Sequence, residues 1–193
     1  KNIFTDGKSW SKESKYAVGG LMKHSEALTS IACSTVNSYN GLVPRVGGFE
    51  GGTVTWAPTN ITYGHNNRSA QFRLPQNRYC IENRAADMMM NVYLALAMTL
   101  SAANEGIKNK IDPGKPTDQD LYQMTDAEFK KLGIRQLPKN LLQAIEALKK
   151  DKLSDEVLGS VMKKSYLSYK NDEWERYHQA VTDWEVKEYL RLY

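Results

Sequence analysis

Charged side chains that could bind an anion and a metal ion gather between residues 67 and 87. Arg68 lies at the start of a stretch in which polar and apolar residues alternate, and Arg73 lies within it. Glu82 and Arg84 are two residues apart, which puts both side chains on one face of a strand. A guanidinium suits phosphate or carboxylate because its planar fork donates two hydrogen bonds at once. A carboxylate beside it could hold a divalent cation that bridges phosphates. The residues therefore predict an anion site next to a metal site.

A pair of structural salt bridges is the alternative interpretation, and the spacing alone favours it because charged strands are common at sheet surfaces. A second candidate lies upstream. Residues 37–52 contain five glycines and a proline, which predicts a loop with unusual backbone freedom. Glu50 is the carboxylate in it, so the loop is either a mobile flap that carries Glu50 or an ordinary surface turn.

Several elements must position these side chains. Periodicity predicts a helix, three strands, a buried helix capped by Asn91, a polar loop and three C-terminal helices. In chain order they span Lys15–Ala32, Thr53–Tyr63, Ser69–Leu74, Cys80–Arg84, Asn91–Gly106, Lys108–Thr125, Pro138–Lys150, Ser154–Ser168 and Asp172–Tyr193. We expect the Gly19-Gly20 pair to permit close packing of the first helix, and we assign no role to His24 within it.

The overall composition narrows the class of protein. The chain has 193 residues, a net charge of +4 and two cysteines, Cys33 and Cys80, which fit no disulfide framework or metal motif. No apolar run has membrane-spanning length, and the start has no signal peptide. We therefore expect a cytoplasmic protein with reduced thiols, without a membrane or nucleic-acid partner. Residues 1–110 would form part of a catalytic domain, and residues 111–193 a loop and helical section of the same domain.

Seven motifs in order resemble the glutamine synthetase family and cover nearly the whole chain. They are Asn37–Pro44, the glycine loop with Glu50, Asn67–Ala70, Arg73–Pro75, Ile81–Arg84, Asn91–Ala97 and Glu105–Ile111. The sequences of the glycine loop and of the Glu-Asn-Arg-Ala-Ala-Asp stretch are most similar to those of type III glutamate–ammonia ligases and γ-glutamylmethylamide synthetases. The resemblance overrides the salt-bridge interpretation. It implies an α+β fold: part of a catalytic half-barrel of antiparallel strands, followed by C-terminal helices.

The resemblance implies ATP-dependent ligation of ammonia, or another small amine, to glutamate through γ-glutamyl phosphate. Arg68 and Arg73 would contact ATP phosphates, and Glu82 would bind a divalent metal, Mg²⁺ or Mn²⁺. Arg84 would hold the glutamate carboxylate or the acyl phosphate. Glu50 would close over the substrate and help to deprotonate ammonium. Asn37, which leads into the flap, and Arg45 would assist substrate binding.

Three positions depart from the family pattern. Gly41 stands where most members have an arginine that binds the glutamate carboxylate, and Arg45 or Arg78 could replace it. Cys80 stands where common bacterial enzymes have a further arginine. Tyr122 aligns with a loop tyrosine that some of those enzymes adenylylate, but it lacks the usual flanking prolines, so we expect an ordinary loop residue.

The family's other metal ligands and its N-terminal domain would lie upstream of Lys1. We therefore expect the segment alone to bind Mg²⁺ weakly and to lack ligase activity. The resemblance also implies a homo-oligomer of two stacked hexameric rings. Two alternatives stay open. The acceptor could be methylamine or a longer amine, or the protein could be a catalytically silent ring-forming homologue.

Overall fold

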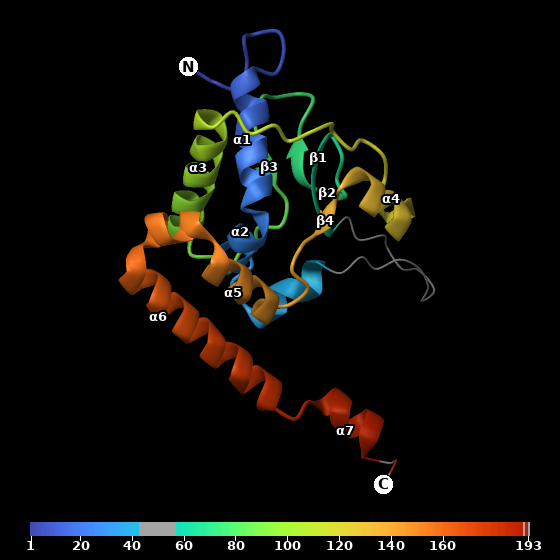
Figure 1. Cartoon of the computed structure of the whole chain (residues 1–193). Coiled ribbons are helices and arrows are strands. Elements are labelled where there is room, and N and C mark those ends of the chain that lie inside the picture. Colours follow the sequence, from blue (N-terminus) through green and yellow to red (C-terminus); the bar gives the residue numbers. More distant parts are fainter. Residues whose placement is uncertain (43–56, 191, 193) are drawn as a thin grey trace.

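The computed structural model describes residues 1–42, 57–190 and 192. Helices and a small sheet share one body, from which a C-terminal arm projects (Figure 1). The elements, in chain order, are α1 (Lys12–Lys23), α2 (Ser25–Ala32), η1 (Val36–Leu42), β1 (Asn60–His65), β2 (Ala70–Leu74), β3 (Glu82–Asn83), α3 (Val92–Lys108), η2 (Leu121–Gln123), α4 (Asp126–Leu132), β4 (Arg135–Gln136), α5 (Leu141–Lys150), α6 (Lys152–Gln179) and α7 (Asp183–Tyr189). The α+β class predicted from the sequence is confirmed.

The predicted first helix is two helices that meet at His24. Ser11 caps α1 by accepting a hydrogen bond from the Ser14 amide, and His24 leaves helical geometry at the junction with α2. The helix α3 runs side by side with α1 (Figure 1). A Cβ added to Gly106 would meet the Tyr16 carbonyl oxygen at 2.1 Å and the Gly20 amide at 2.6 Å. The two helices thus touch through their backbones, as expected for the glycine pair.

The sheet has the strand order β3-β2-β1-β4. The pairs β2–β3 and β1–β4 are antiparallel, as expected, whereas β1 and β2 run parallel, which corrects the all-antiparallel prediction. Parallel neighbours usually need a crossover of a dozen residues or more. Here residues 66–69 alone connect the two strands.

Two asparagines make this short return possible. Asn66 has a φ of 60°, in the left-handed region that asparagine tolerates better than most residues. The buried Asn67 side chain donates to the carbonyls of Thr117 at 2.7 Å and Gln119 at 2.9 Å, and it accepts from the Ser69 amide at 2.8 Å. These bonds tie the connection to the loop that follows α3. The strand boundaries also differ from the prediction, because β1 begins at Asn60 and β3 contains two residues.

Two apolar clusters form the core, and both combine residues from before and after position 110. The first lies between α1, α2, α3 and one face of the sheet, and α5 and α6 add to it. It includes Val18, Leu28, Ile31, Phe72, Met98, Leu148 and Leu153. The second, around α5 and η1, includes Tyr39, Ile61, Leu137, Leu141 and Ile145. Residues 111–193 therefore complete the core that residues 1–110 begin.

The helix α3 buries one face and exposes the other, which corrects the prediction of a fully buried helix. Ala95, Met98, Ala102 and Gly106 are buried. Val92, Tyr93, Leu96 and Leu100 are exposed despite their apolar character. As predicted, Asn91 caps the helix by accepting hydrogen bonds from the amides of Tyr93 and Leu94. An exposed apolar face of this kind marks a surface that other protein can cover.

The C-terminal helices differ from the prediction in their breaks. The predicted interruption between residues 168 and 172 does not exist, because α6 continues through it to Gln179. The break lies instead at Gly159, which has a φ of 68°. The second part of α6 packs on the body, where Tyr166 donates to the Ser30 carbonyl at 2.6 Å and Glu173 accepts from the Val36 amide at 3.1 Å. The helix ends at Gln179, and the chain continues into α7 (Figure 1). Among the described residues, none of the helices is both long and apolar enough to cross a membrane.

Candidate functional site

The sheet brings Arg73 and Glu82 directly opposite one another. The two residues are register partners on the antiparallel strands β2 and β3. Arg73 Nη1 donates to Glu82 Oε2 at 2.9 Å. A second guanidinium, that of Arg78, bonds to the other oxygen, Glu82 Oε1. The predicted metal carboxylate therefore lies between two arginines.

Arg73 is fixed from several sides. Its Nη2 also donates to Asn66 Oδ1, so the connection between β1 and β2 positions it. Its side chain is 17% exposed, and its Nε is buried without a hydrogen-bond partner. Such a donor is costly to leave unpaired. The asparagine signals a turn in the sequence, but sequence reasoning did not identify it as a partner of Arg73.

The Arg84 side chain contacts the backbone of Arg68. The Arg84 Nε donates to the Arg68 carbonyl at 3.0 Å, and the Arg84 amide donates to the Gln71 carbonyl at 2.8 Å. Burial lowers the pKa of Arg84, and the charges of Arg73 and Arg68 lower it further, against the opposing effect of Glu82. The Arg68 side chain is exposed. Four of the predicted site residues thus lie in one electrostatic group.

Glu82 is held as a carboxylate. Partial burial raises its pKa, but the hydrogen bonds and charges of Arg73 and Arg78 outweigh burial, so the pKa is lowered overall. As a metal ligand it could supply one oxygen. Mg²⁺ needs about six oxygen ligands, often from phosphates and water. The described residues contain no group of three or more His, Cys, Asp or Glu that could hold an ion together. Glu82 therefore fits a site that ATP phosphates and further ligands would complete.

A shallow cavity of about 450 Å³ joins Arg84 to the position of the missing arginine. Gly41, Arg84 and Asp87 are among its lining residues. A Cβ at Gly41 would meet no atom of residues 1–42 or 57–190 within 4 Å, so this part of the chain leaves room there. Asn37 lies exposed on η1, one turn before Gly41. The other two predicted residues, Glu50 and Arg45, lie outside the described residues.

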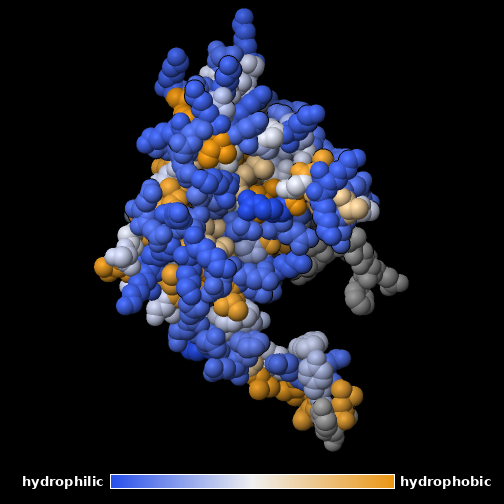
Figure 2. Space-filling view, in the orientation of Figure 1, coloured by the Kyte–Doolittle hydropathy of each residue, from blue (hydrophilic) through white to orange (hydrophobic). Residues whose placement is uncertain are grey.

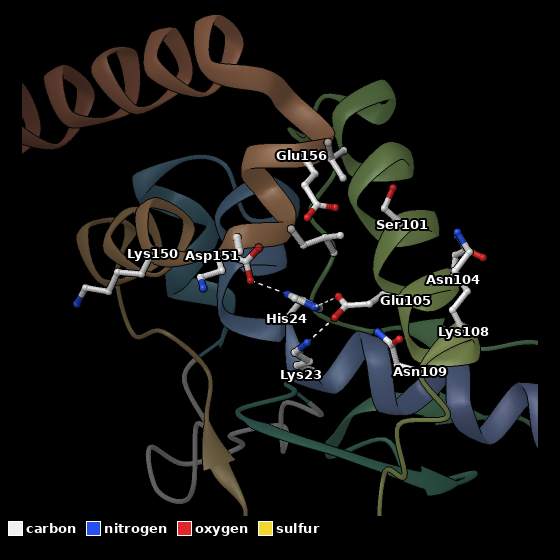
Figure 3. A pocket seen from close by; sticks show the side chains of 13 residues that line it. Lys23, His24, Ser101, Asn104, Glu105, Lys108, Asn109, Lys150, Asp151 and Glu156 are labelled. Carbon is white, nitrogen blue, oxygen red and sulfur yellow. Dashed lines mark hydrogen bonds and ion pairs between the residues drawn. The ribbon is translucent and has the colours of Figure 1, made fainter.

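Polar side chains meet at a second, larger cavity of about 850 Å³ at the ends of α1, α3 and α5. There His24 is 6% exposed and lies between two carboxylates (Figure 3). Its Nδ1 contacts Asp151 Oδ2 at 2.6 Å, and its Nε2 contacts Glu105 Oε2. Lys23 pairs with the other oxygen of the same carboxylate, Glu105 Oε1. Burial lowers the pKa of His24, but the bonds and charges of Asp151 and Glu105 outweigh it and raise the pKa.

This arrangement corrects the assignment of no role to His24. With a carboxylate at each ring nitrogen, the charged imidazolium satisfies both contacts because it donates from both nitrogens. Its partners come from two other helix ends, so the cluster is a clamp between α1, α3 and the α5–α6 junction (Figure 3). A lone helical histidine gives no sequence signal for distant partners, and packing alone brought them together.

Two smaller expectations concern the thiols and the loop tyrosine. Cys33 and Cys80 are both free, as expected, and Cys33 is buried. Arg78 Nε donates to Cys80 Sγ at 3.1 Å, so the thiol beside Glu82 helps to hold this guanidinium. Tyr122 is partly buried and donates to the Ala57 carbonyl. Its adenylylation or lack of it stays a prediction.

Comparison with known proteins agrees with the fold. The family model for the glutamine synthetase catalytic domain matches residues 1–189. Glutamate–methylamine ligase of Methyloversatilis universalis is 41% identical over 198 residues, which cover 100% of this chain and 43% of that protein. A glutamine synthetase of Archaeoglobus fulgidus is 41% identical over 187 residues, or 94% of this chain and 36% of that protein.

A solved structure of GmaS in complex with ADP superposes with a TM-score of 0.83 at 35% identity, covering 99% of this chain and 43% of that one. The fold and these matches define part of a ligase catalytic domain. The chain belongs to the glutamine synthetase family. It spans less than half the length of the relatives named above.

Proposed function

We propose that the protein carrying this chain is an ATP-dependent ligase that joins ammonia, or a small amine, to the side-chain carboxyl of glutamate. The observation that carries the proposal is the grouping of three arginines with Glu82 on and beside the adjacent strands β2 and β3. The arginines are Arg68, Arg73 and Arg84. Phosphoryl transfer depends mainly on positioning and on neutralising charge, which such a group provides. A silent homologue would have no reason to keep four such side chains.

Each side chain would act at one point of the reaction. Arg68 and Arg73 would hold phosphate oxygens of ATP while the glutamate carboxylate attacks the γ-phosphorus and ADP leaves. Arg84 would hold the glutamate carboxylate or the acyl phosphate, and the amine would then displace phosphate. A divalent metal, Mg²⁺ or Mn²⁺, bound through Glu82 would neutralise phosphate charge. Glu50, Asn37 and Arg45 would assist from the glycine loop and the 3-10 helix before it.

A methylamine-type acceptor is the second candidate. Two observations favour it: one relative carries the name glutamate–methylamine ligase, and Gly41 leaves open space in the cavity that Arg84 lines. The arginine that most family members have at the position of Gly41 would occupy that space. The assembly would be a homo-oligomer, with two stacked hexameric rings as the family arrangement. The exposed apolar residues of α3 and of the C-terminal arm support an assembly of this kind.

The test is a rate measurement on the complete protein with ATP, Mg²⁺ and glutamate. We expect amide formation that requires all three and an amine. Parallel assays with ammonia and methylamine identify the acceptor by the larger kcat/KM. Absence of any amide with every amine, in protein that folds and assembles, would contradict the proposal.

A further inference from the structure

Both oxygens of the Glu82 carboxylate are occupied. Arg73 Nη1 contacts Oε2 at 2.9 Å, and Arg78 Nη2 contacts Oε1. A divalent cation binds a carboxylate through oxygen lone pairs, and each Glu82 oxygen has two of them, so the bonds to Arg73 and Arg78 do not fill the carboxylate. The positive charge of each guanidinium nevertheless repels a cation at the same oxygens. Withdrawal of one guanidinium therefore strengthens cation binding to Glu82.

The two arginines differ in how firmly they are held. Arg73 is 17% exposed and also bonds to Asn66, so moving it would break two hydrogen bonds of a partly buried guanidinium. Arg78 is 59% exposed, and its remaining contact is with Cys80 Sγ at 3.1 Å, a weak acceptor. Once released, the Arg78 guanidinium is hydrated again. The free-energy cost is small, because an exposed ion pair contributes little to stability. Arg78 is therefore the one that gives way.

The backbone beside Arg78 does not need to move. The Tyr79 carbonyl accepts from Asn2 Nδ2 at 2.9 Å, and the Tyr79 ring packs edge-on against Trp10 at 5.3 Å between centroids. On the other side of Arg78, β2 ends at Leu74. With both flanks anchored, the change is confined to the long Arg78 side chain, whose rotamers interconvert quickly at the surface.

We propose that Arg78 is a displaceable counter-ion of Glu82, which occupies the carboxylate until a divalent cation replaces it. The idea rests on the proposed function, since it takes Glu82 as a metal ligand. The consequence is a cation site that is weak on its own. The cation is then retained mainly when it arrives with the phosphates of the nucleotide, whose negative charge offsets the competition from Arg78.

The test measures Mn²⁺ binding to the complete protein without nucleotide, by electron paramagnetic resonance of free Mn²⁺. Arg78→Gln removes the competitor and should tighten the Kd by about two- to fivefold, the range expected for loss of an exposed ion pair. Arg68→Gln removes the same charge from the same group without touching Glu82, and it should tighten the Kd less. Arg135→Gln, which breaks the distant exposed pair with Glu26, should leave the Kd unchanged.

Two outcomes would overturn the inference. One is equal tightening by Arg78→Gln and Arg68→Gln, which would mean a general field effect. The other is an unchanged or weaker Kd in Arg78→Gln. Amide formation is measured separately on the unmodified protein. That assay tests the proposed function and involves no substitution at Arg78. Ligase activity together with an unaltered Kd in Arg78→Gln would refute the displacement and leave the proposed function standing.

Discussion

At the scale of single residues, Glu82 connects a partly buried guanidinium to an exposed one. Arg73 reaches it across the β2–β3 pair, and Arg78 reaches it from the preceding turn. The spacing of Glu82 and Arg84 in the sequence indicated a shared face. It gave no sign of the cross-strand pair or of Arg78, since both depend on how the turn between β2 and β3 closes.

Replacing Glu82 with Ala in the complete protein should abolish ligase activity. The change removes the proposed metal ligand and leaves the guanidiniums of Arg73 and Arg78 without this partner. We expect at least about a 100-fold fall in kcat, as for removal of other charge-stabilising groups. The measurement is phosphate release with glutamate and ammonia. Glu26→Ala, which breaks an exposed ion pair with Arg135, is the control and should retain activity. Unchanged activity in Glu82→Ala would show that the site is assigned wrongly.

Gly41→Arg tests the substrate end of the site. Because a Cβ there meets nothing within 4 Å, the new side chain should not disturb the fold. Its guanidinium would enter the cavity lined by Arg84 and add a second group that can bind a carboxylate of glutamate. We expect KM for glutamate to fall several-fold, about the effect of one charged hydrogen bond, while KM for ATP stays constant. A KM for glutamate that stays the same or rises would argue against a substrate role for this cavity.

At the scale of elements, the ends of three helices meet at His24. The sequence indicated the helices themselves, because periodicity and a cap such as Asn91 are local signals. It did not indicate the breaks at His24 and Gly159, or the continuous helix through residues 168–172, because tertiary contacts decide them. In the same way, the parallel β1–β2 pair depends on distant bonds from Asn67 to residues 117 and 119.

The His24 clamp should make stability depend on pH. Its folded-state pKa is raised, so its stabilisation is full below the unfolded-state pKa of about 6.5 and is lost as pH rises through the folded value. Substituting His24→Gln should lower the free energy of unfolding by about 3 kcal/mol at low pH, since a buried charged partner is removed. The difference from the unmodified protein should shrink in alkaline buffer. Urea unfolding at several pH values measures it.

The control for the clamp is His65→Gln. His65 is 38% exposed, and its Nδ1 lies 3.4 Å from Asp118 Oδ2, a long contact near water. This variant should lose little stability at any pH. A loss in His24→Gln that is the same at all pH values would contradict a charged clamp and indicate ordinary packing.

Close packing of α1 against α3 gives a second prediction at this scale. In Gly106→Ala, the new methyl group would lie about 2.1 Å from the Tyr16 carbonyl oxygen in the present geometry, so the helices must separate. We expect a loss of about 2 kcal/mol in the free energy of unfolding, typical of overpacking. Gly41→Ala, in open space, should cost far less. Equal losses in thermal unfolding would contradict the close approach.

At the scale of the whole molecule, the C-terminal arm is the part least covered by the body. Beyond the body, α6 leads to α7 (Figure 1), and apolar residues gather near its end (Figure 2). Val181, Trp184, Leu190 and Leu192 are all exposed. Apolar side chains exposed together on an arm have no core to join within the described part of this chain, and they suit contact with another subunit.

Trp184→Glu should therefore reduce the size of the assembly. The indole is 61% exposed, and a charge there would make its burial in a subunit contact unfavourable. Analytical ultracentrifugation of the complete protein should show smaller species. Lys187→Gln, on the same helix, should leave the size unchanged. An identical sedimentation profile for Trp184→Glu would place the subunit contacts elsewhere.

The transfer of an oxygen atom from glutamate to phosphate tests the proposed chemistry most directly. The complete protein is supplied with ATP, an amine, and glutamate whose side-chain carboxylate carries ¹⁸O. If the carboxylate attacks the γ-phosphorus and the amine later displaces phosphate, each phosphate released must carry one ¹⁸O atom from glutamate. Phosphate without the label, formed alongside the amide, would contradict the γ-glutamyl phosphate route.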